Sequence, residues 1–124
     1  MRLLVRMALS CLALGCGTIE PGEQATAVLT GTVRRGPITP ACQNDVPCDE
    51  PFSAMFHVRR DARRIATFVS GPDGAFTVTL PPGDLIVVPD ASAPLMSPTS
   101  QAKPVSLRAG TLTEVTLSFD TGIR

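Results

Sequence analysis

Alternation of apolar and polar residues is the feature that most limits how this chain can fold. The clearest run places Phe76, Val78 and Leu80 on one side and the two intervening threonines on the other. A period of two residues is typical of a β-strand with one buried face. Beyond residue 26, no segment has apolar residues at helical spacing over three turns, which argues against a helix-rich fold.

Seven short runs follow one another, separated by turn-forming residues. The 12 Pro and 10 Gly supply these turns, because Pro presets φ and Gly accepts a positive φ. One run, residues 85–88, is apolar throughout, as expected for a strand that is covered on both faces. We therefore predict an all-β fold, a seven-stranded β-sandwich. The expected strands cover residues 27–34, 52–59, 64–70, 76–80, 85–88, 105–107 and 114–119.

The start of the chain has the arrangement of a secretory signal. Arg2 and Arg6 flank the start of a short apolar stretch that ends in small residues before Cys16. A charged region, an apolar region and a small-residue end are typical of exported proteins. The apolar stretch is shorter than the roughly 20 residues that a membrane-spanning helix needs. We expect residues 1–15 to be a cleaved signal peptide.

The segment Leu12-Ala13-Leu14-Gly15-Cys16 resembles the lipobox of bacterial lipoproteins. The resemblance implies that Cys16 becomes the new N-terminus and carries a diacylglyceryl group and an acyl chain such as palmitate. It also implies the outer membrane in a cell with two membranes. The alternative is an ordinary signal peptide with Cys16 as a spare thiol. Residues 16–26 are then the lipidated N-terminus and a flexible tether, and residues 27–124 form the domain.

Three motifs occur in an order similar to that of the carboxypeptidase regulatory-like domain. They are Gly-Thr-Val at residues 31–33, Gly-Pro-Asp-Gly-Ala-Phe-Thr-Val-Thr-Leu-Pro-Pro-Gly at residues 71–83, and Pro-Val-Ser-Leu at residues 104–107. The resemblance implies a prealbumin-like (transthyretin-like) Greek-key sandwich of seven strands. This chain departs from the family at Leu85, where the family commonly has Tyr. We expect this change to alter core packing more than the fold.

Cys42 and Cys48 are predicted to form a structural disulfide. Of the four cysteines, Cys11 leaves with the signal peptide and Cys16 takes the lipid, so these two remain. Their spacing differs from the Cys-x-x-Cys of redox sites. A metal site needs more ligands than two thiolates, and His57 is the only histidine. We predict no metal and no cofactor.

No group of residues in the sequence predicts catalysis. His57 lies on the strand face opposite to Phe56 and Val58, and we expect it to be exposed at the surface. The hydroxyisourate hydrolases share the prealbumin-like sandwich, but similarity to them would imply several histidines and a Tyr-Arg-Gly-Ser C-terminus, which this chain lacks. We predict a non-enzymatic protein without catalytic residues. An enzyme of unknown type is the less favoured alternative.

A group of arginines and a long loop are the candidate binding elements. Arg59, Arg60, Arg63 and Arg64 surround an expected hairpin tip, where they could contact an anionic surface. The alternative is a solvated turn. The second candidate is the stretch at residues 91–102, because loops of this length often bind partners.

Charge and aromatic content narrow the class of partner. Eleven basic and eleven acidic residues balance, which argues against nucleic-acid binding. Carbohydrate-binding modules usually present aromatic platforms, and five Phe without Trp or Tyr make such a module an alternative. We expect a binding or structural module that meets the membrane through its lipid and contacts an envelope protein or glycan.

Overall fold

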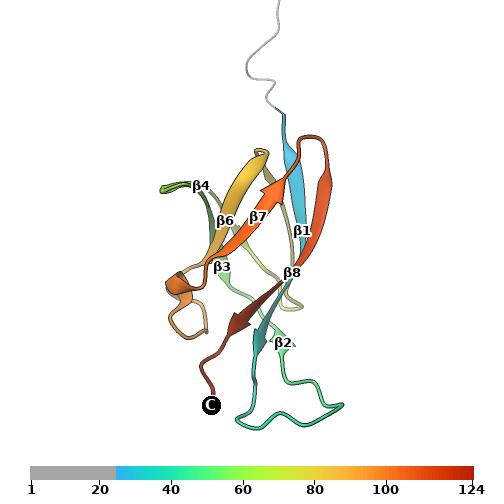
Figure 1. The fold of residues 1–124 in the computed structure, drawn as a ribbon, viewed down its shortest axis with the longest axis vertical. Coiled ribbons are helices and arrows are strands. Elements are labelled where there is room, and N and C mark those ends of the chain that lie inside the picture. Colours follow the sequence, from blue (N-terminus) through green and yellow to red (C-terminus); the bar gives the residue numbers. More distant parts are fainter. Residues whose placement is uncertain (1–24) are drawn as a thin grey trace, which may run out of the picture.

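The computed structural model describes residues 25–124. The predictions for the signal peptide and Cys16 lie outside these residues. Two four-stranded sheets make up the described part, which confirms the all-β sandwich (Figure 1). The elements are β1 (Ala27–Gly36), β2 (Glu50–Pro51), β3 (Met55–Arg60), β4 (Arg63–Val69), β5 (Ala75–Leu80), β6 (Gly83–Pro89), the short 3-10 helix η3 (Pro98–Ser100), β7 (Lys103–Leu107) and β8 (Leu112–Asp120).

The first sheet is organised around β1. On one side β1 pairs in parallel with β8. On the other side it pairs antiparallel with β5 and, further along, with β2. The second sheet has the order β4-β3-β6-β7, and all its strands are antiparallel. Strand β1 begins at one end of the sandwich, whereas the loop before β2 and the C-terminus lie at the opposite end (Figure 1).

The structure has eight strands where the sequence pattern predicted seven. The additional strand is β2, which pairs Pro51 with Arg34 and Glu50 with Arg35. Two residues are too few for alternation to be recognised, and Pro is depleted in strands because it donates no ladder hydrogen bond. The strand count was therefore wrong by this short addition to the edge of the first sheet.

The expected strand at residues 52–59 begins later than predicted. Strand β3 starts at Met55, and the residues before it bond to the buried side chain of Ser70 instead of a ladder. The Ser70 hydroxyl donates to the Phe52 carbonyl at 2.9 Å and accepts from the Ala54 amide at 3.0 Å. A side chain that satisfies backbone groups in this way competes with strand pairing.

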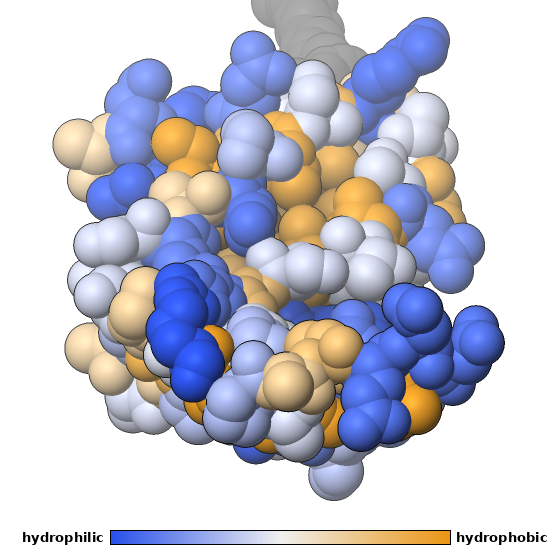
Figure 2. All heavy atoms as spheres, turned by 60° about the horizontal axis from the view of Figure 1, so that its bottom comes forward, coloured by the Kyte–Doolittle hydropathy of each residue, from blue (hydrophilic) through white to orange (hydrophobic). Residues whose placement is uncertain are grey.

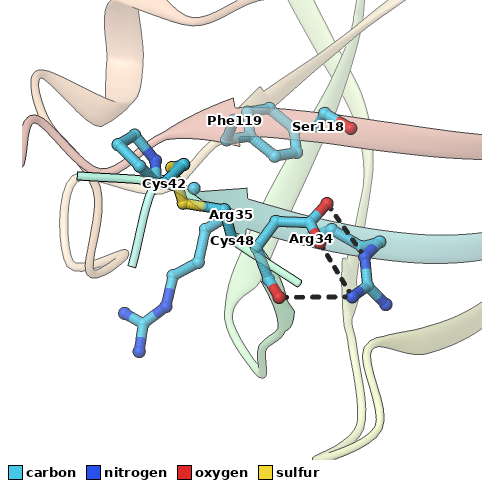
Figure 3. A pocket seen from close by; sticks show the side chains of 9 residues that line it. Arg34, Arg35, Cys42, Cys48, Ser118 and Phe119 are labelled. Carbon is cyan, nitrogen blue, oxygen red and sulfur yellow. Dashed lines mark hydrogen bonds and ion pairs between the residues drawn. A yellow bond between two sulfur atoms is a disulfide. The ribbon is translucent and has the colours of Figure 1, made fainter. Parts of the chain in front are cut away.

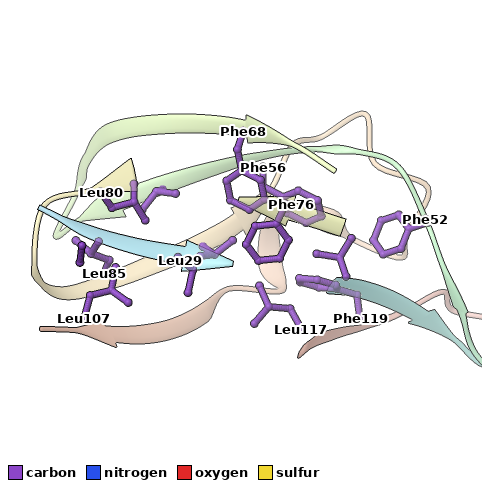
Figure 4. Close-up of a cluster of buried hydrophobic side chains, with 14 residues drawn as sticks. Leu29, Phe52, Phe56, Phe68, Phe76, Leu80, Leu85, Leu107, Leu117 and Phe119 are labelled. Atoms are coloured by element: carbon purple, nitrogen blue, oxygen red, sulfur yellow. The ribbon is translucent and has the colours of Figure 1, made fainter. Parts of the chain in front are cut away.

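The core between the sheets is aromatic toward one end and aliphatic toward the other. All five phenylalanines are buried and form one connected cluster, with ring centroids 4.6 to 6.1 Å apart. Leu80, Leu85 and Leu107 pack at the far end from Phe52 and Phe119 (Figure 4). Leu85 is 1% exposed and forms part of this aliphatic end of the core.

Gly31 allows β1 and β8 to come close together. A Cβ atom on this residue would lie 1.8 Å from the carbonyl oxygen of Val115 on β8. Real Cβ atoms do not approach backbone oxygens this closely, so no larger residue fits without moving a strand. The glycine of the Gly-Thr-Val motif is therefore required by the parallel pairing of the first and last strands.

Candidate functional site

The disulfide lies at the end of the sandwich where β1 stops. Cys42 and Cys48 are bonded, with their Cα atoms 5.6 Å apart, which confirms the predicted pairing. Beside them is an open hollow of about 390 Å³. Its floor includes Phe119, and Arg34 and Arg35 point in different directions from β1 (Figure 3).

The charges around this hollow are already paired. Arg34 contacts the carboxylate of Asp49 at 3.1 Å, and Arg35 contacts that of Glu50 at 2.6 Å. The Arg34 hydrogen bond holds the pKa of Asp49 below its usual range. Because each arginine has its own carboxylate, the hollow offers little free charge to a ligand.

The surface at this end is mixed in character. Figure 2 shows separate hydrophobic areas between hydrophilic ones over this face. Val46 and Met96 are about half exposed, at 53% and 45%. Scattered apolar residues of this kind are normal on protein surfaces and do not by themselves mark an interface.

The outer face of the second sheet carries a different kind of hollow. The β6–β7 loop, residues 90–102, folds back over this face, and η3 lies in contact with β6. The resulting cavity of about 280 Å³ is called the outer-face pocket. It is lined by His57, Arg59, Arg64, Val88, Pro89, Asp90, Ala91 and Thr99. Val88 is only 7% exposed, whereas Ile86 on the same face is half-buried, so the predicted covering of both faces holds at Val88 and is incomplete at Ile86.

His57 is not the exposed surface residue that the sequence predicted. It does lie on the face opposite to Phe56, but its side chain is only 12% exposed. Its Nε2 contacts the Asp90 carboxylate at 2.6 Å, and its Nδ1 lies 3.2 Å from the Thr67 hydroxyl. The prediction failed because the β6–β7 loop covers this face, which alternation along β3 cannot show.

Asp90 anchors the start of the β6–β7 loop. Its second oxygen accepts hydrogen bonds from the Ser92 hydroxyl at 2.6 Å and the Ser92 amide at 3.0 Å. The Ser92 hydroxyl and then His57 hold the pKa of Asp90 well below its usual range. Asp90 is therefore an ionised carboxylate whose hydrogen-bonding capacity is directed at His57 and Ser92.

The four arginines predicted to act together are divided by the structure. Arg60 donates to the Pro82 carbonyl at the end of the sandwich, and Arg63 is exposed opposite Arg60 on the hairpin. Arg59 and Arg64 both line the outer-face pocket. Only this second pair shares a site.

A β-bulge brings Arg59 and Arg64 together. The register changes between Val58 and Arg59: Val58 is opposite Ala66, but Arg59 is opposite Arg64, so Ile65 is skipped. Bulges redirect side chains in this manner and are common beside functional sites. Like charges that face one another directly on a sheet are destabilising, so this pairing is unfavourable for the fold alone.

Arg59 has an unsatisfied donor inside the protein. Its Nε is buried and has no hydrogen-bond partner among residues 25–124. A buried donor without a partner costs about 1–3 kcal/mol of stability. Within the same range, neither Arg59 nor Arg64 is ion-paired with a carboxylate. The outer-face pocket is therefore lined by two arginines without an ion-pair partner among the described residues, Arg59 half-buried and Arg64 exposed.

The donor set of the outer-face pocket favours an anion over a cation. No cluster of three or more metal-ligating side chains occurs within residues 25–124.

Thr67, His57 and Asp90 form a hydroxyl–imidazole–carboxylate series. The sequence did not predict this series because the three residues come from three separate segments. His57 and Thr67 are register partners on β3 and β4. Alternation along each strand shows that both are on a polar face, but the position of Asp90 depends on the loop. No helix in the described part has the length and apolar character needed to cross a membrane.

Comparison with known proteins supports the fold and nothing finer. No family model matches the chain, and no curated protein is significantly similar to it. Solved structures of similar fold include a DUF3823 family protein from Parabacteroides merdae, with a TM-score of 0.53 and 17% identity over 78% of this chain and 47% of that one. The Bacillus anthracis TIE protein also has a TM-score of 0.53, with 16% identity over 77% of this chain and 16% of that one.

A second DUF3823 family protein, from Bacteroides ovatus, is 23% identical over 73% of this chain and 43% of that one, with a TM-score of 0.49. This chain therefore spans less than half the length of each of these proteins. At such identities the similarity supports a shared β-rich architecture and does not transfer any activity.

Proposed function

We propose that this chain is an exported lipoprotein whose carboxypeptidase regulatory-like sandwich acts as a non-enzymatic binding module at the bacterial cell envelope. The lipid on Cys16 holds it at the membrane. The outer-face pocket binds the partner, an envelope protein or a glycan. A carbohydrate-binding or cell-wall-binding module is the second form of this proposal, and it uses the same pocket.

One observation carries the binding role. The outer-face pocket holds Arg59 and Arg64 directly opposite each other, without carboxylate partners among residues 25–124. Natural sequences usually avoid such local conflicts except at functional sites. The hollow beside the disulfide has paired charges instead.

The anchoring part of the proposal rests on the lipobox-like segment. Strand β1 begins at Ala27, 11 residues after Cys16 in the sequence. Intact mass of the membrane-extracted protein tests this point, because lipidation adds a diacylglyceryl group. An unmodified mass, or unchanged membrane fractionation of Cys16→Ala, contradicts it.

Site-directed photo-crosslinking in cells tests the binding role. A photoreactive amino acid replaces Thr99, which is exposed at the rim of the outer-face pocket. The matched control replaces Thr79, which is exposed on β5 in the other sheet. We expect an envelope component to be captured from position 99 but not from position 79, with less capture in the Cys16→Ala background. Equal capture from both positions contradicts a binding role for this pocket.

A further inference from the structure

The arginine pair of the outer-face pocket indicates the chemistry of its ligand. We infer that Arg59 and Arg64 together bind one oxyanion group, a phosphate or a carboxylate, carried by a small ligand or by the end of a larger one. This inference rests on the proposed binding role of the pocket and is independent of the lipid on Cys16.

The geometry of the two strands brings the charges to one place. Arg59 on β3 and Arg64 on β4 are register partners because of the bulge after Val58, and both side chains line the same cavity. A guanidinium group has a planar fork of donors that matches two oxygens of a phosphate or carboxylate. Two guanidinium groups from adjacent strands can thus share one oxyanion.

The unpaired donor of Arg59 supports the same ligand class. Its Nε is buried and has no partner among residues 25–124, and buried polar groups in native proteins are normally satisfied. An anion between Arg59 and Arg64 supplies the missing negative charge, and it supplies the missing acceptor once the Arg59 side chain turns its Nε toward the pocket.

Asp90 contributes a carboxylate to the lining of the pocket, but this carboxylate does not pair with Arg59 or Arg64. One of its oxygens contacts His57 at 2.6 Å, and the other accepts from Ser92. No ion pair joins Asp90 to either arginine. The carboxylate of the pocket is thus bonded to His57 and Ser92 instead of to the arginines.

The size of the pocket limits what else the ligand contributes. Its volume of about 280 Å³ is just below the range of small-molecule sites, which starts at about 300 Å³. Val88, Pro89 and Ala91 provide an apolar wall, and Thr99 provides a hydroxyl group. One sugar-sized or amino-acid-sized unit that bears the oxyanion fits this space.

Nuclear magnetic resonance of the arginine Nε–Hε groups tests the inference directly. The full-length chain in a neutral detergent is titrated with inorganic phosphate, acetate, glucose 6-phosphate and glucuronate. In a separate sample, without detergent, it is titrated with phosphatidylglycerol vesicles. Ionic strength is kept constant with sodium chloride, because surface charges respond to salt in general. The Arg59 signal is assigned by its loss in Arg59→Lys, since lysine has no Nε–Hε group.

We expect a saturable shift of the Arg59 signal, and a weakening of at least about tenfold in Arg64→Gln. Arg63→Gln is the matched control, because it removes the same charge from an exposed position on the same hairpin, and it should bind as the unmodified protein does. Saturation by the soluble oxyanions indicates a soluble or glycan source, and saturation by vesicles alone indicates a lipid headgroup. Either result supports the oxyanion site.

Absence of a saturable shift with every probe overturns the inference, as does equal weakening in Arg63→Gln and Arg64→Gln. These failures are distinct from failure of the proposed function. If crosslinking from position 99 succeeds while the titration fails, the pocket binds a partner by other chemistry. If the titration succeeds while crosslinking fails, the oxyanion site stands and the envelope role does not.

Discussion

Two loops of equal length lie in this sandwich, and they are held in place by different means. The β1–β2 loop, residues 37–49, contains the disulfide, and residues 39–47 are exposed throughout. The β6–β7 loop, residues 90–102, contains no cysteine. It is tied to the sheets by hydrogen bonds of its own side chains.

Gln101 fastens the end of the β6–β7 loop to β8. Its amide nitrogen donates to the carbonyls of Met96 and Asp120, at 2.7 and 2.9 Å, and its amide oxygen accepts from the Asp120 amide at 2.7 Å. At the other end, Asp90 contacts His57. The β1–β2 loop is thus cross-linked internally and joined to the first sheet only near its ends, through Asp49 and Pro37, whereas the β6–β7 loop is fastened to both sheets.

The difference shows which loop is suited to shape a site. A short disulfide stabilises mainly by restricting the unfolded chain, and it places no demand on where the loop lies over the sheet. Hydrogen bonds to the sheets specify position, because buried polar groups must meet their partners. The β6–β7 loop, and not the cross-linked one, borders the pocket that contains Arg59 and Arg64.

The largest effect is expected from a change that disturbs the anchors of both loops. Gly36, the residue before the β1–β2 loop, is the register partner of Asp120 on β8. Asp120 is also the residue to which Gln101 of the β6–β7 loop is hydrogen-bonded. Gly31→Ala forces β1 and β8 apart, because the new Cβ would overlap the Val115 carbonyl. We expect a loss of about 3 kcal/mol or more in the free energy of unfolding, measured by urea denaturation.

Gly110→Ala provides the comparison for that change. Gly110 has a positive φ of 74° but no atom within 4 Å of an added Cβ, so only the backbone term of about 1 kcal/mol should appear. An equal effect of the two substitutions contradicts the close-approach argument for Gly31.

The second largest effect is expected from opening the disulfide. Replacing Cys42 and Cys48 by Ser should lower the free energy of unfolding by about 2 kcal/mol in the chain-entropy description. Hydrogen exchange followed by mass spectrometry should speed up in residues 37–49 and stay unchanged in residues 90–102. Faster hydrogen exchange in both loops means that the two loops are coupled, and it contradicts their being held in place by separate means.

Gln101→Ala should change hydrogen exchange in the opposite loop. Three hydrogen bonds to backbone groups are lost, which should destabilise the protein by about 1–2 kcal/mol. Exchange should increase in residues 90–102 and at Asp120, with residues 37–49 unaffected. Gln101→Glu keeps an acceptor for the Asp120 amide, so its stability should lie between those of Gln101→Ala and the unmodified protein. Unchanged exchange in Gln101→Ala means that the hydrogen bonds do not hold the loop.

The smallest effect concerns pH. The pKa of Asp90 in the folded protein lies below its unfolded value of about 3.9. Its contribution to stability is therefore complete above about pH 5 and is lost as the pH falls through and below 4. Asp90→Asn should show a smaller fall in thermal midpoint between pH 7 and pH 2 than the unmodified protein.

Asp49→Asn is the matched change in the other loop. The Asp49 pKa is also lowered, through its hydrogen bond to Arg34, but Asp90 accepts hydrogen bonds from both Ser92 and His57. The pH dependence should therefore be reduced more by Asp90→Asn than by Asp49→Asn. The reverse order contradicts the assignment of Asp90 as the better-anchored carboxylate.

Local sequence patterns determined most of the strands and one cross-link. Alternation located six of the eight strands because side-chain direction in a strand depends only on position along the chain, and a continuous apolar run located a seventh. The even number of cysteines left after Cys11 and Cys16 predicted the Cys42–Cys48 bond, which the structure confirms. Lipidation of Cys16 stays a prediction from the lipobox-like segment.

Only the tertiary structure decided the site. Whether His57 is exposed depends on the β6–β7 loop, and which arginines share a pocket depends on a single skipped residue in the β3–β4 register. These features arise from contacts between segments far apart in the chain, and a pattern along one strand carries no information about what covers it. The sequence thus determined which faces are polar, and packing determined that one polar face became a pocket with two unpaired positive charges.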